Sequence, residues 1–199
     1  MGDRAGNFAV QNSDLLLAVG TRLSIRQVGY NWKTWAREAK VVMVDIDPAE
    51  MKKPTIHVDM PVHADAKDFF EALLRRTEKN SAENPVSLRE DWREQCRLWK
   101  ERYPVTLERH WAENGKTANV FAFIRFLSDS LPENSLTAVS NGACCVVGHQ
   151  IWRMKRGTRF IINSAVASMG YGLPAAIGLC LAAEGKETIC LEGDGSIKP

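Results

Sequence analysis

A short apolar run that ends in a glycine-rich turn is the part of the sequence best suited to chemistry. Residues 188–191 are apolar or β-branched, as in a strand buried on both faces, and Gly193-Asp194-Gly195-Ser196 follows closely. Glycines let a backbone turn sharply beside a ligand, an aspartate can bind a hard cation, and a serine can cap a helix whose N–H groups face an anion. Because ligands of open α/β sheets lie at the carboxyl ends of strands, this turn predicts a phosphate and divalent-metal site. Gly-Asp-Gly alone is equally typical of a plain tight turn.

Residues 160–179 carry a second motif, and they read FIINSAVASMGYGLPAAIGL. The pair ASMGYGLPAAIG and LEGDGS resembles the diphosphate-binding domain of thiamine diphosphate (ThDP) enzymes, and within them it is most similar to the acetolactate synthase group. The order and spacing of the two motifs make the resemblance specific. It implies that three loops form a ThDP site. The cofactor-binding residues would be Asn141, Gly142, Ala143, Ala167, Ser168, Met169, Gly193, Asp194, Gly195 and Ser196.

The resemblance also implies a role for each loop. The loops at 141–143 and 193–196 would hold the diphosphate, and Asp194 would bind Mg²⁺, which keeps octahedral oxygen coordination and bridges phosphate oxygens. Residues 167–169 would lie under the ThDP rings, with Met169 as the apolar wedge that bends the cofactor. The alternative for Met169 is an ordinary core methionine.

No catalytic residue is predicted in this chain. In the family, the glutamate that activates the cofactor comes from a separate pyrimidine-binding domain on a partner subunit, and a second metal ligand lies well downstream of the aspartate. The resemblance therefore implies a partial chain that is inactive alone, and a full-length enzyme that is a homodimer or homotetramer. His149 invites comparison with the family's Gly-Gln-His-Gln, but a gap-free count back from Met169 places Gly-Gln on Gly142-Ala143 and leaves His149 inside a helix without a role.

Alternating patterns predict the elements that position these loops. Pro61 is expected to interrupt regular secondary structure, and residues 32–39 are expected to form a short amphipathic segment. Residues 80–85 are expected to form a linker, and Asn114-Gly115 is expected to form a turn. Strands are expected at 15–19, 41–46, 55–58, 136–140, 160–163 and 188–191, and helices at 64–76, 87–102 (with a capping box at Ser87), 120–131, 144–153 and 173–183.

Strands that alternate with helices indicate parallel sheets with right-handed crossovers. The predicted fold class is α/β, with two incomplete doubly wound parallel-sheet domains, one Rossmann-like and one ThDP-binding. By the resemblance, residues 1–78 would be the C-terminal half of a Rossmann-like central domain, 79–118 a helical linker, and 119–199 the N-terminal part of a truncated ThDP diphosphate-binding domain.

The central domain carries FAD in some members of the family, and the ends of its strands supply candidate ligands here. They are Gly20, Arg22, Asp45 and Asp47, since an acid after a second strand can bind a ribose hydroxyl. FAD-binding relatives typically read Arg-Phe-Asp-Asp-Arg after the first strand, whereas this chain reads Arg-Leu-Ser-Ile-Arg at 22–26. FAD and an empty scaffold are the alternatives, and the sequence favours the scaffold.

Composition bounds the class of protein. The chain has 199 residues, 45% of them hydrophobic and 25% charged, with a net charge of +2, which indicates a globular protein that binds neither nucleic acid nor membranes. The five cysteines form no C-x-x-C pair, so we expect reduced thiols and a cytoplasmic location.

Three hypotheses of function follow. The first is a fragment of a ThDP- and Mg²⁺-dependent 2-keto acid decarboxylase or carboligase, which resembles acetolactate synthase of branched-chain amino acid biosynthesis and would act on pyruvate. The second is another ThDP-dependent decarboxylase or carboligase. The third is an inactive nucleotide-binding α/β module.

Overall fold

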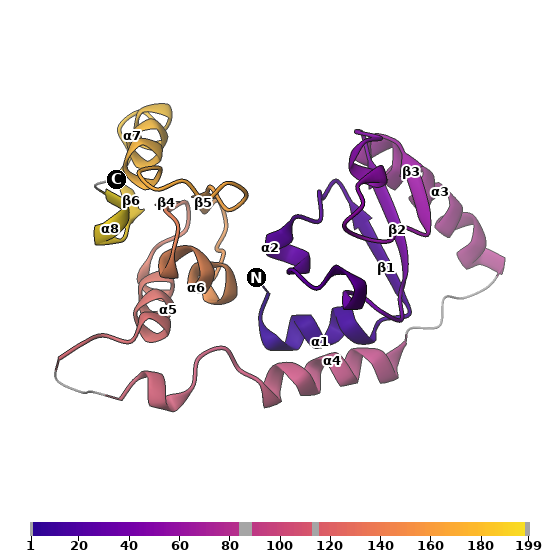
Figure 1. The fold of residues 1–199 in the computed structure, drawn as a ribbon, viewed down its shortest axis with the longest axis horizontal. Coiled ribbons are helices and arrows are strands. Elements are labelled where there is room, and N and C mark those ends of the chain that lie inside the picture. The colour runs from indigo at the N-terminus through magenta and orange to yellow at the C-terminus, as the bar shows by residue number, and fades with distance from the viewer. Residues whose placement is uncertain (1, 84–88, 113–115, 198–199) are drawn as a thin grey trace. The chain divides into compact units, whose positions relative to one another are not determined.

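The computed structural model describes residues 2–83, 89–112 and 116–197. The chain forms two compact units, one of residues 4–103 and one of residues 104–199 with residues 1–3. Both are α/β, and each contains one three-stranded parallel sheet (Figure 1). The predicted fold class, α/β with two incomplete parallel-sheet domains, is confirmed.

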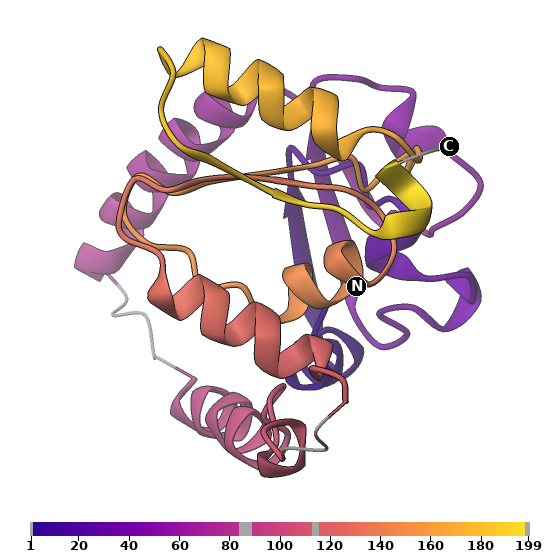
Figure 2. The same cartoon turned by 90° about the vertical axis from the view of Figure 1, so that its left-hand side faces the viewer.

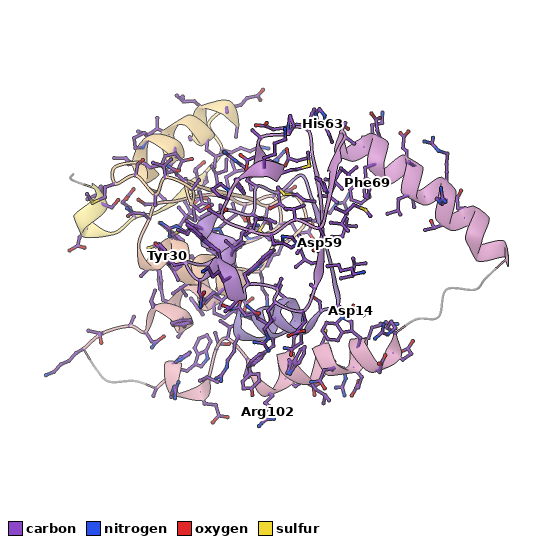
Figure 3. The ribbon with its side chains drawn as sticks, turned by 45° about the vertical axis from the view of Figure 1, so that its right-hand side comes forward. Asp14, Tyr30, Asp59, His63, Phe69 and Arg102 are labelled. Carbon is purple, nitrogen blue, oxygen red and sulfur yellow. The ribbon has the colours of Figure 1, made fainter. Side chains whose placement is uncertain are left out.

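The sheet of the first unit has the order β1-β2-β3. Strand β1 spans Leu15–Val19, β2 spans Lys40–Asp45 and β3 spans Met60–His63. The central strand β2 is the most buried, because sheet neighbours cover both of its edges. Figure 3 labels Asp14, which precedes β1, and His63, which ends β3, at opposite ends of this sheet. The core contains Ala18, Leu23, Val28, Met43 and Ile56, with Leu16, Trp35, Met51 and Val58 packed against it.

The third strand of this sheet differs from the sequence prediction, which placed it at 55–58. That segment is apolar because Ile56 fills the core at 8% exposure, not because it pairs in the sheet. The actual strand β3 includes Pro61, which was expected to break the chain and instead pairs with Met43. Proline lacks an N–H group, and an edge strand tolerates it because one side of the strand needs no donor.

Helices surround this sheet. They are α1 (Arg4–Asn12), α2 (Ile25–Val28), α3 (Ala66–Glu83) and α4 (Glu90–Arg102), with 3-10 turns at Trp32–Thr34 and Glu50–Lys52. Helix α2 was not predicted, and the expected segment at 32–39 forms only one 3-10 turn. Helix α3 continues to Glu83, so the first part of the predicted linker at 80–85 is helical, while its remainder lies outside the described residues.

The apolar side chains of α3 are only partly covered. Phe69, labelled in Figure 3, is half-buried, whereas Phe70, Leu73 and Leu74 are exposed. Helix α4 packs on α1, where the ring of Phe8 lies 5.8 Å from that of Trp99. The predicted capping box at Ser87 lies outside the described residues. The predicted domain boundaries at 78 and 118 stay a prediction.

The sheet of the second unit has the order β5-β4-β6, again parallel. Figure 2 shows α7 on one side of these strands and α5 and α6 on the other. All four residues of β4 are buried, as expected of a central strand covered on both faces. The strands are β4 (Leu136–Val139), β5 (Arg159–Ile162) and β6 (Thr188–Leu191). The helices are α5 (Val120–Ser130), α6 (Ala143–Ile151), α7 (Gly172–Ala182) and α8 (Asp194–Ile197), with a 3-10 turn at Glu108–His110.

Most elements of this unit match the sequence within a residue or two. Asn119 fixes the start of α5, since its Oδ1 accepts the N–H of Phe121 at 2.9 Å. The predicted turn at 114–115 lies outside the described residues. Among the described residues, no helix is both long and apolar enough to cross a membrane.

Candidate functional site

Loops at the carboxyl ends of β4, β5 and β6 are joined by side-chain hydrogen bonds in the second unit. Asn141, after β4, donates from its Nδ2 to the carbonyl of Ala167, after β5, at 2.9 Å. Ser140 Oγ lies 2.8 Å from Ser196 Oγ, and both hydroxyls are buried. The structure therefore brings the three predicted loops together at one edge of the sheet.

The first loop turns sharply at Gly142. Its φ is +73°, a conformation that glycine adopts freely and other residues rarely adopt. A Cβ at Gly142 would meet no described atom within 4 Å, so conformation rather than crowding requires glycine there. Ala143, the last predicted residue of this loop, begins helix α6.

The second loop is held in a conformation unusual for its residues. Ala167 has a φ of +56°, and its N–H donates to the carbonyl of Asn163 at 3.1 Å. Ser168 Oγ lies 3.4 Å from Asn163 Nδ2. Met169 is 61% exposed, so it is not a core methionine in this unit. The loop ends where the N–H of Gly170 donates to the carbonyl of Ser196 at 2.8 Å, which links it to the third loop.

The third loop opens helix α8. Asp194 is exposed and begins that helix, and the carbonyl of Gly193 accepts the N–H of Ser196 at 2.9 Å. A Cβ at Gly193 or Gly195 would meet no described atom within 4 Å. Open space beside two glycines and an exposed carboxylate fits a diphosphate with a hard cation. Within the described ranges, no three His, Cys, Asp or Glu side chains are grouped to hold a metal.

A buried carboxylate behind the third loop was missed by sequence reasoning. Both oxygens of Glu192 are shielded from solvent, and neither has a hydrogen-bond partner among the residues that the structure describes. Burial, and then the Glu192 charge, raise the pKa of the Cys190 thiol, and burial also raises the pKa of Cys144. The available signal was a charged residue placed directly between an apolar strand and a glycine turn.

His149 lies apart from this hydrogen-bonded group. Its Nδ1 lies 2.8 Å from the carbonyl oxygen of Cys145, one helical turn earlier, so this nitrogen carries the proton and donates. Its ring meets the edge of Phe160. His149 is exposed on α6, and these contacts lie within its own helix and with the neighbouring strand β5.

At the corresponding edge of the first unit, the candidate FAD ligands bond to neighbouring residues, and binding of FAD stays a prediction. Arg22 is paired with Glu50 at 2.6 Å, and hydrogen bonds from Lys53 and then Arg22 hold the pKa of Glu50 below its usual range. Asp45 Oδ1 accepts the N–H of Asp47 at 2.9 Å, so this carboxylate is used to close the turn. The carboxylate of Asp47 accepts the N–H of Ala49 at 2.9 Å, so three of the four candidate side chains or backbone groups, those of Arg22, Asp45 and Asp47, bond within the unit.

Comparison with known proteins agrees with these two units. Residues 1–73 match the model of the thiamine pyrophosphate enzyme central domain, and residues 140–198 match the C-terminal TPP binding domain, where TPP is another name for ThDP. Similar proteins include two acetolactate synthase large subunits of Escherichia coli K12. Isozyme 2 is 32% identical, and the match covers 98% of this chain and 33% of the length of isozyme 2. Isozyme 3 is 28% identical, and the match covers 99% of this chain and 33% of the length of isozyme 3.

The acetolactate synthase large subunit of Parasynechococcus marenigrum WH8102 is 33% identical over 98% of this chain and 30% of its own length. The chain thus spans about a third of the length of the curated relatives it matches. The two matched domains occur in the expected order; the first contains the sheet β1-β2-β3, and the second begins directly after β4 and contains β5 and β6. The chain therefore belongs to the thiamine pyrophosphate enzymes, and it is a partial chain similar to acetolactate synthase large subunits.

Proposed function

We propose that the three loops of the second unit bind ThDP and Mg²⁺, as part of an enzyme that decarboxylates a 2-keto acid such as pyruvate and joins the product to a second carbonyl. The observation that supports this most is the hydrogen bonding of the three loops. Asn141 holds the Ala167 carbonyl at 2.9 Å, and Ser196 contacts both Ser140 and Gly170, within residues that match a TPP binding domain.

Each loop has a stated task in this proposal. Asp194 supplies a carboxylate oxygen to Mg²⁺, and Gly142, Gly193 and Gly195 leave room for the diphosphate. Met169 projects from the second loop as an apolar contact for the rings. When bound, ThDP supplies the nucleophilic carbon of the reaction, and the protein orients it. The remaining cofactor-binding residues proposed are Asn141, Ala143, Ala167, Ser168 and Ser196.

The choice among ThDP enzymes depends on residues beyond these loops. The pairing of Arg22 with Glu50 favours a neighbouring decarboxylase or carboligase that uses no FAD as the second candidate. We propose no catalytic acid or base in this chain, and an activating glutamate from a partner subunit would complete the site in a homodimer or homotetramer. A cytoplasmic location stays a prediction.

The test is binding of ThDP in the presence of Mg²⁺, measured by calorimetry on the 199-residue chain and on Asp194→Ala. Loss of a metal ligand should weaken ThDP binding by at least about tenfold, since even outer-sphere changes at metal sites have effects of that size. Glu187→Ala, which removes an exposed acid from the same unit, is the matched control and should bind as wild type does. Equal binding by Asp194→Ala, or binding of ADP and not of ThDP, would favour the nucleotide-binding module instead.

A further inference from the structure

The carboxylate of Glu192 lies in an environment that is unusual for a charged group. Neither oxygen is accessible to solvent, and neither is hydrogen-bonded within the described part of the chain. An unpaired buried carboxylate is strongly unfavourable, so such a group in a native protein calls for a specific explanation. Its position, one residue before Gly193 and two before Asp194, places it directly behind the third loop.

Gly172 makes room for this carboxylate. A Cβ at Gly172 would overlap Glu192 Oε2 and would lie 2.9 Å from Glu192 Cδ and 2.9 Å from Ser140 Cβ. Real Cβ atoms do not approach other atoms so closely, and the φ of Gly172 is not one that only glycine adopts. Glycine is therefore favoured at 172 because Ser140 Cβ and the Glu192 carboxylate together occupy the space that a side chain would fill.

Gly172 is also the first residue of α7, an eleven-residue helix whose N-cap, Tyr171, provides no side-chain cap. The first N–H groups of a helix lack intrahelical acceptors, and the helix dipole favours a negative charge beside them. Pro174 in the first turn has no N–H to offer. The Glu192 carboxylate thus lies against the positive end of α7, where its charge is favourable.

We infer that Glu192 is a positioning residue that fixes the start of α7 against the end of β6, so that the second and third cofactor loops keep one relative position. The second loop ends at Gly170, directly before α7, and the third loop begins at Gly193, directly after Glu192. Two contacts therefore join the loops. One is the contact of Glu192 with Gly172 where α7 begins, and the other is the hydrogen bond from the Gly170 N–H to the Ser196 carbonyl. This inference rests on the proposed cofactor site.

The experiment is a double-mutant cycle read by two measurements, the Kd of ThDP at saturating Mg²⁺ and the hydrogen exchange of β6 and α7 without cofactor. Glu192→Gln keeps the shape of the side chain and removes its charge, and we expect the Kd to rise about three- to tenfold, as loss of a helix-end charge implies. Gly172→Ala should raise the Kd and weaken the hydrogen-exchange protection of α7, because the new methyl group displaces Glu192. In the Glu192→Ala background, Gly172→Ala should have a smaller effect, since the overlap with Glu192 is gone and only the 2.9 Å approach to Ser140 Cβ remains.

Gly178→Ala is the matched control, because Gly178 lies in the same helix and its Cβ would meet no described atom within 4 Å. The inference is overturned if Glu192→Gln binds ThDP as tightly as wild type or more tightly, or if the effects of Gly172→Ala and Glu192→Ala simply add. A wild-type chain that binds no ThDP refutes the proposed function instead. In that case the hydrogen exchange of β6 and α7 across the cycle still decides whether Glu192 and Gly172 are coupled.

Discussion

The pair of buried serine hydroxyls at the centre of the site gives the sharpest test of the described geometry. Ser140 and Ser196 are 2% and 5% exposed, and their Oγ atoms lie 2.8 Å apart. Ser140→Ala removes this hydrogen bond, worth about 0.5–1.5 kcal/mol net, and leaves Ser196 Oγ with the longer 3.4 Å contact to the Gly170 N–H. A buried hydroxyl without a good partner adds about 1–3 kcal/mol of desolvation penalty, so we expect a destabilisation of about 2 kcal/mol.

The double variant Ser140→Ala/Ser196→Ala should be little worse than either single variant, because no hydroxyl then remains unpaired. The chain has two units, and a single melting curve is not a two-state measurement. Peptide-resolved hydrogen exchange over β6 and α7 is therefore the assay. Ser130→Ala serves as the control, since Ser130 is exposed and should change stability by less than about 0.5 kcal/mol. Additive effects of the two buried serines would refute the reasoning, because additivity means that the hydroxyls do not share a bond.

Two further predictions concern the core and the thiols. Met43→Ala should destabilise the first unit by about 2–5 kcal/mol, because Met43 is fully buried in its core, whereas Met60→Ala, at a residue 57% exposed, should change it by less than about 0.5 kcal/mol in urea unfolding. Burial raises the pKa of Cys144 and Cys190, so the unfolded chain releases these protons first, and the free energy of unfolding of the second unit should fall as pH rises above about 8.5. Urea titrations under reductant at pH 7 and pH 10 should show this fall, and Cys144→Ala/Cys190→Ala should reduce it; an undiminished fall in that variant would show that other groups cause it.

The sequence by itself determined the local elements and the family. Strands β1 and β6 begin and end as predicted, because an uninterrupted apolar run flanked by turn residues specifies a parallel strand without help from distant residues, although only Ala18 of β1 and Leu191 of β6 are buried in this chain. The turn at Gly142 and the loop at 193–196 also depend on local residues, because their glycines allow the backbone to turn sharply after a strand. The order of the two motifs was enough to indicate ThDP enzymes, which the matched domains confirm.

Tertiary structure alone decided which apolar segments pair and which merely fill space. The segment at 55–58 looks like a strand because Ile56 is apolar, but only packing shows that it closes the core while Met60–His63 forms the edge strand. Helix α3 runs beyond its predicted end because the residues at 80–83, three of them polar, are compatible with both helix and linker.

The details of the site are likewise non-local. Ser140 and Ser196 are 56 residues apart in sequence, and no pattern within either segment reveals their bond. The contact of Glu192 with Gly172 depends on how α7 lies over the ends of β4 and β6. Sequence periodicity reports which face of an element is apolar, whereas the partner that meets each face is chosen by the packing of the whole unit.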